Sequence, residues 1–78
     1  MRGKVYPGDL AVYYASMQSQ LHRTWVQNEN RLSGQCGVVR QDDVVLVLTV
    51  VEKMAFVLST RSNQMGWVER NLFNAYAG

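Results

Sequence analysis

A long apolar run in the second half of the chain constrains the fold more than any other feature. Residues 44–60 read V-V-L-V-L-T-V-V-E-K-M-A-F-V-L-S-T, and only Glu52 and Lys53 bring charge into the run. β-Branched residues dominate it, a composition that favours strands buried on at least one face. The run therefore predicts two consecutive strands, 44–51 and 54–60, joined by a tight turn.

The length and composition indicate a small globular protein. The chain has 78 residues, enough for one domain, and we expect residues 1–78 to form it. A domain of this size buries only about 60–65% of the surface that its unfolded chain exposes. Its stability then depends on a dense core or on a partner that covers part of it. The 47% hydrophobic content argues against disorder.

Targeting signals and membrane spans are not evident in the sequence. Cys36 is the only cysteine, so no intrachain disulfide can form, which fits a reducing compartment. Apolar runs stay below the roughly 18–20 residues of a membrane span, and no apolar segment follows the basic N-terminus. We therefore expect a cytoplasmic protein with no membrane partner.

Turn residues divide the rest of the chain into further short strands. Pro7 and Gly8 form a turn signal. Asp42 and Asp43 form another, because Asp side chains accept hydrogen bonds from nearby backbone N–H groups. Between and after these signals the sequence predicts strands at 10–14, 36–41 and 66–69, a polar loop at 61–64 and a helical turn at 71–76.

The polar segment 16–34 allows two interpretations. One is a long loop, because Gln, Asn, Ser and Thr surround Trp25 and Val26. The other is a helix over 9–28 capped by Asp9, because apolar residues recur every three or four positions. Those residues are Leu10, Tyr14, Met17, Leu21 and Trp25.

Three short motifs resemble the SH3-like barrel family, including its KOW-type members. G-W-V-E-R-N-L-F at 66–73 is similar to the ending of SH3 domains, where a strand leads into a 3₁₀ turn and a last short strand. P-G-D-L-A-V-Y at 7–13 and G-Q-C-G-V-V at 34–39 are similar to the glycine pattern of KOW-type barrels. The resemblance implies a mostly β fold, a small five-stranded barrel with a long first loop and a terminal 3₁₀ turn. The alternative is an α+β fold, with helix 9–28 on an antiparallel meander.

The sequence departs from peptide-binding SH3 domains at the positions that hold their ligand. Met54-Ala55-Phe56 stands where those domains carry a paired Trp. Glu69 replaces the proline of the terminal motif, and Leu72 replaces its tyrosine. The resemblance therefore implies the barrel and not the proline-rich peptide site.

Aromatic and basic residues are the candidates for a binding surface. Aromatic side chains can form a groove for a ligand, or they can simply close the ends of a barrel. Five of the six arginines, spread singly among polar residues, suit either phosphate contacts or ordinary solubility: Arg23, Arg31, Arg40, Arg61 and Arg70. The partner surface expected from the sequence comprises Tyr13, Tyr14, Trp25, Trp67 and Arg70.

Catalytic and metal-binding constellations are missing from the sequence. His22 and Cys36 are the only residues of their kinds, and no acidic cluster joins them at metal-ligand spacing. Asp42 and Asp43 are adjacent rather than facing, which suits a turn better than acid–base catalysis. We expect no metal, no cofactor and no enzymatic activity.

The strand at 44–51 is apolar on both faces, although a small barrel covers only its inner face. Strict alternation places Val45, Val47 and Val51 on one face. The opposite face would carry Val44, Leu46, Leu48 and Val50. Either segment 16–34 folds over this second face through Met17, Leu21 and Trp25, or the face is a homo-oligomer interface.

Two functions are consistent with these observations. The first is a non-catalytic binding or assembly module for protein partners or self-association, of a size that suits a bacterial or phage accessory protein. The alternative is a nucleic-acid-binding small barrel of the KOW type, suggested by the pI of about 9.0 and the mixture of arginine and aromatic residues.

Overall fold

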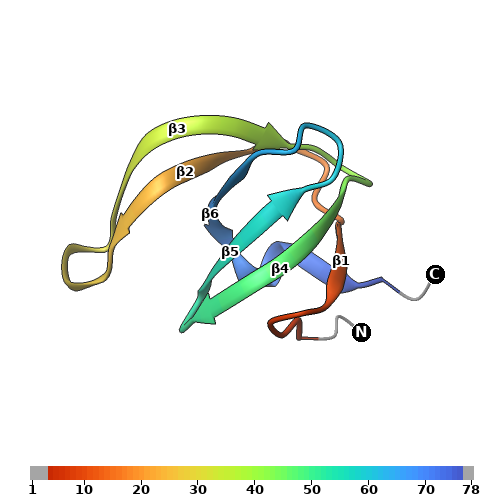
Figure 1. Ribbon diagram of the computed structural model, residues 1–78, viewed down its shortest axis with the longest axis horizontal. Coiled ribbons are helices and arrows are strands. Elements are labelled where there is room, and N and C mark those ends of the chain that lie inside the picture. The colour runs from red at the N-terminus through yellow and green to blue at the C-terminus, as the bar shows by residue number, and fades with distance from the viewer. Residues whose placement is uncertain (1–3, 77–78) are drawn as a thin grey trace.

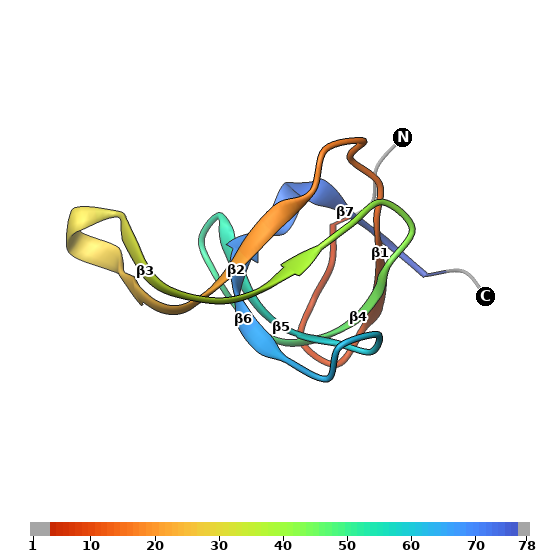
Figure 2. The same ribbon diagram turned by 90° about the horizontal axis from the view of Figure 1, so that it is seen from above.

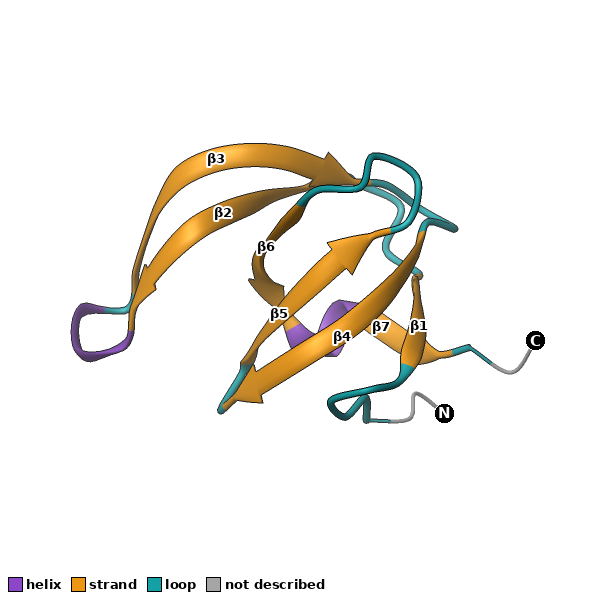
Figure 3. Cartoon of the chain, viewed as in Figure 1, coloured by secondary structure: helices purple, strands orange, loops and turns teal. Residues whose placement is uncertain are grey.

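The computed structural model describes residues 4–76, and strands account for most of them (Figures 1 and 3). These residues contain no α-helix and two short 3₁₀ turns, so the expected mostly β class is confirmed and the alternative helix at 9–28 is wrong. The elements are β1 (Leu10–Tyr13), β2 (Ser19–Val26), η1 (Gln27–Glu29), β3 (Arg31–Val39), β4 (Val44–Val51), β5 (Met54–Ser59), β6 (Met65–Glu69), η2 (Arg70–Leu72) and β7 (Phe73–Ala75).

The seven strands form one antiparallel sheet in the order β3-β2-β6-β5-β4-β1-β7. The sheet curls around its core, as Figure 2 shows, but the edge strands β3 and β7 do not pair with each other. A closed five-stranded barrel is therefore not what the chain forms. The strand count differs because the segment expected to be the long first loop supplies two strands of its own.

The β4–β5 hairpin follows the sequence prediction in position but not in the direction of every side chain. β4 spans the predicted residues, and β5 ends one residue early. A β-bulge between Val47 and Thr49 shifts the register, so that Val50 lies opposite the buried Ala55. Val50 consequently packs against the core, and the strict alternation expected along β4 fails beyond Val47.

Segment 16–34 forms most of the β2–β3 hairpin rather than a loop or a helix. β2 pairs with β3 along nearly its whole length, and its middle also pairs with β6, His22 lying opposite Trp67. Asn30 closes the turn in the left-handed conformation, with φ of 49°, which asparagine tolerates better than most residues. The hairpin tip projects away from the rest of the sheet (Figure 1).

The chain ends in a 3₁₀ turn followed by a strand. The expected terminal 3₁₀ turn is present as η2, but the helical turn predicted over 71–76 is wrong beyond Leu72. β7 pairs with β1 instead, Phe73 lying opposite Tyr13. The backbone N–H of Arg70 donates to the carbonyl of Lys53 at 2.8 Å, which fixes η2 against the β4–β5 turn.

The core lies inside the curl of the sheet and receives residues from all seven strands and from the segment before β1. Tyr13 and Phe73 meet edge to face at a centroid distance of 5.4 Å. The buried cluster comprises Val5, Ala11, Tyr13, Leu21, Val39, Val45, Val47, Ala55, Val57, Val68 and Phe73.

The approach of β2 to β6 leaves no room for a side chain at Gly66. A Cβ atom added there would lie 2.7 Å from Leu21 Cβ and 2.9 Å from the backbone nitrogen of His22. Both of those atoms belong to a paired strand, so neither can move without shifting β2. Glycine at this position therefore allows the hairpin to join the sheet.

We predict that Gly66→Ala lowers the free energy of unfolding by about 1–3 kcal/mol, because β2 must move away from β6. Urea denaturation followed by tryptophan fluorescence measures the change. Gly37→Ala is the matched control, since an added Cβ there meets only the flexible side chain of the exposed Gln64. Equal losses in the two variants would contradict the role assigned to Gly66.

Candidate functional site

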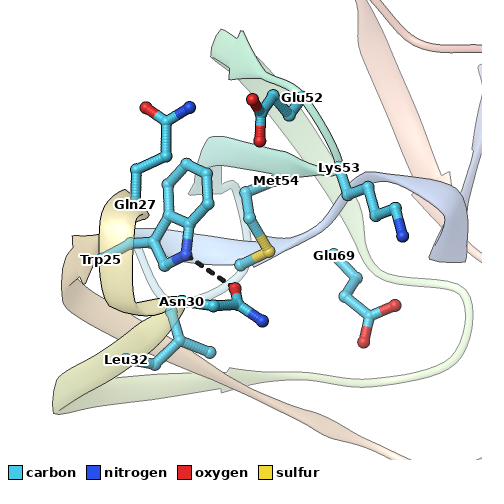
Figure 4. Close-up of a pocket in the computed structure, with 8 residues that line it drawn as sticks. All are labelled: Trp25, Gln27, Asn30, Leu32, Glu52, Lys53, Met54 and Glu69. Carbon is cyan, nitrogen blue, oxygen red and sulfur yellow. Dashed lines mark hydrogen bonds between the residues drawn. The ribbon is translucent and has the colours of Figure 1, made fainter.

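A pocket of about 650 Å³ lies between the tip of the β2–β3 hairpin and the β4–β5 turn (Figure 4). The hairpin supplies one wall, and the turn together with the adjoining ends of β5 and β6 supplies the other. The lining residues are Trp25, Gln27, Asn30, Leu32, Glu52, Lys53, Met54 and Glu69.

The hairpin turn holds the aromatic wall of the pocket in place. Trp25 lies opposite Leu32 in the β2–β3 pairing, which brings both apolar side chains to the same side of the hairpin. The indole Nε1–H of Trp25 donates to Asn30 Oδ1 at 3.1 Å. Figure 4 shows the amide nitrogen of Asn30 turned away from the indole, where it can donate to a ligand.

A chain of three aromatic rings connects this wall to the centre of the sheet. The ring centroids of Trp25 and Trp67 are 5.3 Å apart, and those of Trp67 and Phe56 are 5.1 Å apart. Contacts of this kind add about 0.5–1.5 kcal/mol each beyond the area that they bury. The row therefore anchors the projecting hairpin to β6 and β5.

The lining combines an apolar floor with an acidic rim. Met54, which is only 5% exposed, contributes the floor, and Trp25 and Leu32 add apolar surface from the hairpin wall. Glu52 and Glu69 bring two negative charges to the rim, and Lys53 brings one positive charge. Because the net charge of the lining is negative, the pocket favours a ligand that presents an apolar group beside a cationic one.

Of the five residues expected to form a partner surface, the structure brings Trp25 and Trp67 together and gives the other three different roles. Tyr13 is 1% exposed and lies in the core, so it cannot meet a ligand. Its hydroxyl donates to the carbonyl of Met17 at 2.6 Å and lies 2.7 Å from Ser19 Oγ. Tyr13 therefore ties the β1–β2 connection to the core.

Tyr14 and Arg70 serve the C-terminal part of the fold. The hydroxyl of Tyr14 donates to the carbonyl of Asn71 at 2.8 Å. Arg70 Nε donates to the carbonyl of Val5 at 2.9 Å, and its guanidinium lies 5.0 Å from the ring centroid of Tyr6. These contacts hold the two ends of the described chain together, and neither residue lines the pocket.

Contacts within the protein hold three of the arginines in place. Arg31 pairs with Glu29 at 2.9 Å, and Arg61 pairs with Asp43 at 3.1 Å. Arg61 also donates to the carbonyl of Val38 at 3.2 Å. With Arg70 held by Val5, three of the five arginines considered for phosphate contacts already have partners within the protein.

His22 and Cys36 lie on paired strands, although the sequence placed them in separate segments. Cys36 occupies the irregular step in β3 opposite Leu21 and His22. Its thiol lies 2.9 Å from the carbonyl of Met65 and forms a hydrogen bond with it. No group of three or more His, Cys, Asp or Glu residues within 4–76 is arranged to hold a metal ion.

The residues expected at an oligomer interface divide between two environments. Val44 and Leu46 lie on the face of β4 opposite the core, since their neighbour Val45 is fully buried. Leu48 is partly exposed beside the bulge, whereas Val50 packs against the core. Val50 therefore does not belong to the outer face.

Sequence reasoning missed most of the residues that line the pocket. Asn30, Leu32 and Glu69 come from elements that are far apart in the sequence or were expected to be loop. The local signal that could have found the hairpin is the polar stretch 27–30, which lies between the apolar pair Trp25-Val26 and the pair Arg31-Leu32 and has a typical length for a hairpin turn, although only Leu32 of the second pair is apolar. No local signal indicates that Glu69 faces the hairpin.

Among residues 4–76, no helix has the length and apolar character needed to span a membrane. No protein-family model, curated protein or solved structure matches the chain significantly.

We predict that Tyr13→Phe lowers the free energy of unfolding by about 1–2 kcal/mol, because the partly buried hydrogen bonds of the phenol to the Met17 carbonyl and the Ser19 hydroxyl are lost. Thermal unfolding followed by circular dichroism measures the loss. Tyr76→Phe removes the same hydroxyl from a side chain that is half exposed, and it should leave the stability unchanged. An unchanged free energy of unfolding in Tyr13→Phe would show that water replaces the phenol as a partner of Met17 and Ser19 with no loss of stability.

Proposed function

We propose that the protein is a non-catalytic module that binds protein partners, and that its fold is an open relative of the SH3-like barrel. The family proposal is supported by the strand order. The order across the sheet runs β7, β1, β4, β5 and β6 before it reaches β2 and β3. The β2–β3 hairpin stands where the long first loop was expected, and η2 precedes the last strand.

The pocket at the hairpin tip is the single observation that carries the binding proposal. Its apolar floor and its two carboxylates suit a short extended segment that presents an apolar side chain next to Lys or Arg. Trp25 offers the face of an indole to such a cation, an interaction worth about 0.5–2 kcal/mol. A proline-rich ligand is not proposed, because Trp25 is the only aromatic residue of the lining.

Selection from a library of random peptides displayed on phage tests this proposal. We expect the enriched peptides to combine an apolar residue with a neighbouring basic residue. Synthetic versions should bind at least about tenfold more weakly to Glu69→Gln than to the wild-type protein, because the rim loses one of its two carboxylates. Trp25→Ala should weaken binding further, because the pocket lining then loses its largest apolar side chain.

Glu29→Gln is the matched control for the charge change. Glu29 lies at the hairpin tip, pairs with Arg31 and does not line the pocket. Its substitution should leave peptide affinity unchanged, and circular dichroism of each variant reports whether the sheet remains folded. Equal effects of Glu29→Gln and Glu69→Gln would reject the pocket as the binding site.

The same protein samples also address nucleic-acid binding. A fluorescent RNA of random sequence, titrated at low salt, should show no binding, because three of the five arginines are held within the fold. Peptide selection without enrichment, together with RNA binding that weakens steeply with salt, would support the nucleic-acid alternative instead.

A further inference from the structure

Asn30 has two separate roles at the tip of the β2–β3 hairpin. Its backbone lies in the left-handed region, with φ of 49° and ψ of 45°, and its N–H donates to the carbonyl of Gln27 at 3.1 Å. Its side-chain Oδ1 accepts the indole N–H of Trp25 at 3.1 Å. The first role closes the turn, and the second ties the turn to the aromatic wall of the pocket.

The hydrogen bond to Asn30 decides which part of the Trp25 side chain a ligand can meet. An indole has one hydrogen-bond donor and no acceptor. Because Asn30 takes that donor, the rest of the ring presents only carbon surface to the pocket (Figure 4). Such a surface suits an apolar side chain or a cation above the ring, and it offers no hydrogen bond to a neutral polar group.

The other contacts of the indole do not fix the direction of its N–H. Trp67 packs against the ring at a centroid distance of 5.3 Å, and Leu32 lies opposite Trp25 in the hairpin pairing. Both of these neighbours are apolar at the contact. The outer torsion of an aromatic side chain has roughly two-fold freedom, so a flip of the ring is the main alternative conformation. The hydrogen bond to Asn30 opposes that flip.

We propose that Asn30 is a positioning residue, which holds the Trp25 indole so that its carbon surface, and not its N–H, meets a bound peptide. This role rests on the proposed peptide-binding function of the pocket. Asn30 acts through Trp25, and it favours peptides that place an apolar and a basic side chain against the ring. Peptides that would accept a hydrogen bond from the indole are disfavoured, because its donor is already occupied.

Three substitutions separate the positioning role of Asn30 from its role in the turn. Asn30→Gly removes the acceptor and still allows the left-handed backbone. Asn30→Asp keeps an acceptor for the indole N–H, and aspartate also tolerates this backbone. Asn28→Gly is the matched control, because it makes the same change in the same turn at a residue that does not line the pocket. Thermal unfolding followed by circular dichroism should show that all three variants are folded.

The indole N–H signal of Trp25 in proton NMR reports the positioning without any ligand. The chain has two tryptophans, and Trp25→Phe assigns their indole signals by removing one of them. Asn30→Gly should shift the Trp25 signal and speed its exchange with solvent at least about threefold, because a hydrogen bond is lost. Asn30→Asp should keep the slow exchange, and Asn28→Gly should match the wild type. A Trp25 signal that is unchanged in Asn30→Gly would overturn the proposal.

Peptide affinity is the second readout, and its probe is a blocked synthetic peptide of about eight residues with one leucine next to one lysine. Asn30→Gly should weaken binding of this peptide at least about threefold, and Asn30→Asp should restore it. In Trp25→Phe, which has no indole N–H, adding Asn30→Gly should cause no further loss. A loss that Asn30→Asp does not restore, or that persists beside Trp25→Phe, would overturn the positioning role, because Asn30 would then contact the peptide directly.

The positioning role and the proposed function can fail separately. Wild-type protein that binds the peptide, with no loss in Asn30→Gly, would reject the positioning role and leave the pocket as the binding site. Wild-type protein that binds neither this peptide nor any peptide from the phage selection would reject the proposed function, and the role of Asn30 would fall with it.

Discussion

At Gly66 the backbone of β2 passes so close to β6 that an added Cβ would lie under 3 Å from Leu21 and His22. Most of the distinctive structure depends on this approach. It lets His22 pair opposite Trp67, it makes β2 and β3 part of the sheet, and it brings Trp25 onto the ring of Trp67. Without this close approach, the hairpin would not lie beside the β4–β5 turn, and the pocket between them would not exist.

The molecule divides its apolar side chains among three places. Those that point inside the curl form the core, and Trp25 and Met54 line the pocket. Leu46, Leu58 and their neighbours lie on the outer face of the sheet. A domain of this size cannot cover all of its apolar residues with its own chain. The apolar residues that line the pocket are the physical basis of the peptide-binding proposal.

Part of the fold follows directly from local sequence. The strands β1, β4, β5 and β6 lie within one or two residues of their predicted bounds, because β-branched alternation and turn residues such as Asp42 act over a few positions. The turn at Glu52-Lys53 was predictable for the same reason, whereas the terminal 3₁₀ turn was implied by the resemblance to SH3-like barrels. Trp25 and Trp67 were predicted as binding residues, and the structure places their rings in contact.

The sequence by itself thus determined where most strands begin and end, and that they are buried. Only the tertiary structure decided that 19–39 is a hairpin, that Tyr13 points into the core and that Glu69 meets the hairpin tip. The hydrogen bonds between β2 and β6 join residues more than forty positions apart, and no side-chain period records them. The bulge after Val47 likewise turns Val50 inward. This change comes from the backbone geometry of the bulge, and the alternation of valines and leucines in the sequence does not predict it.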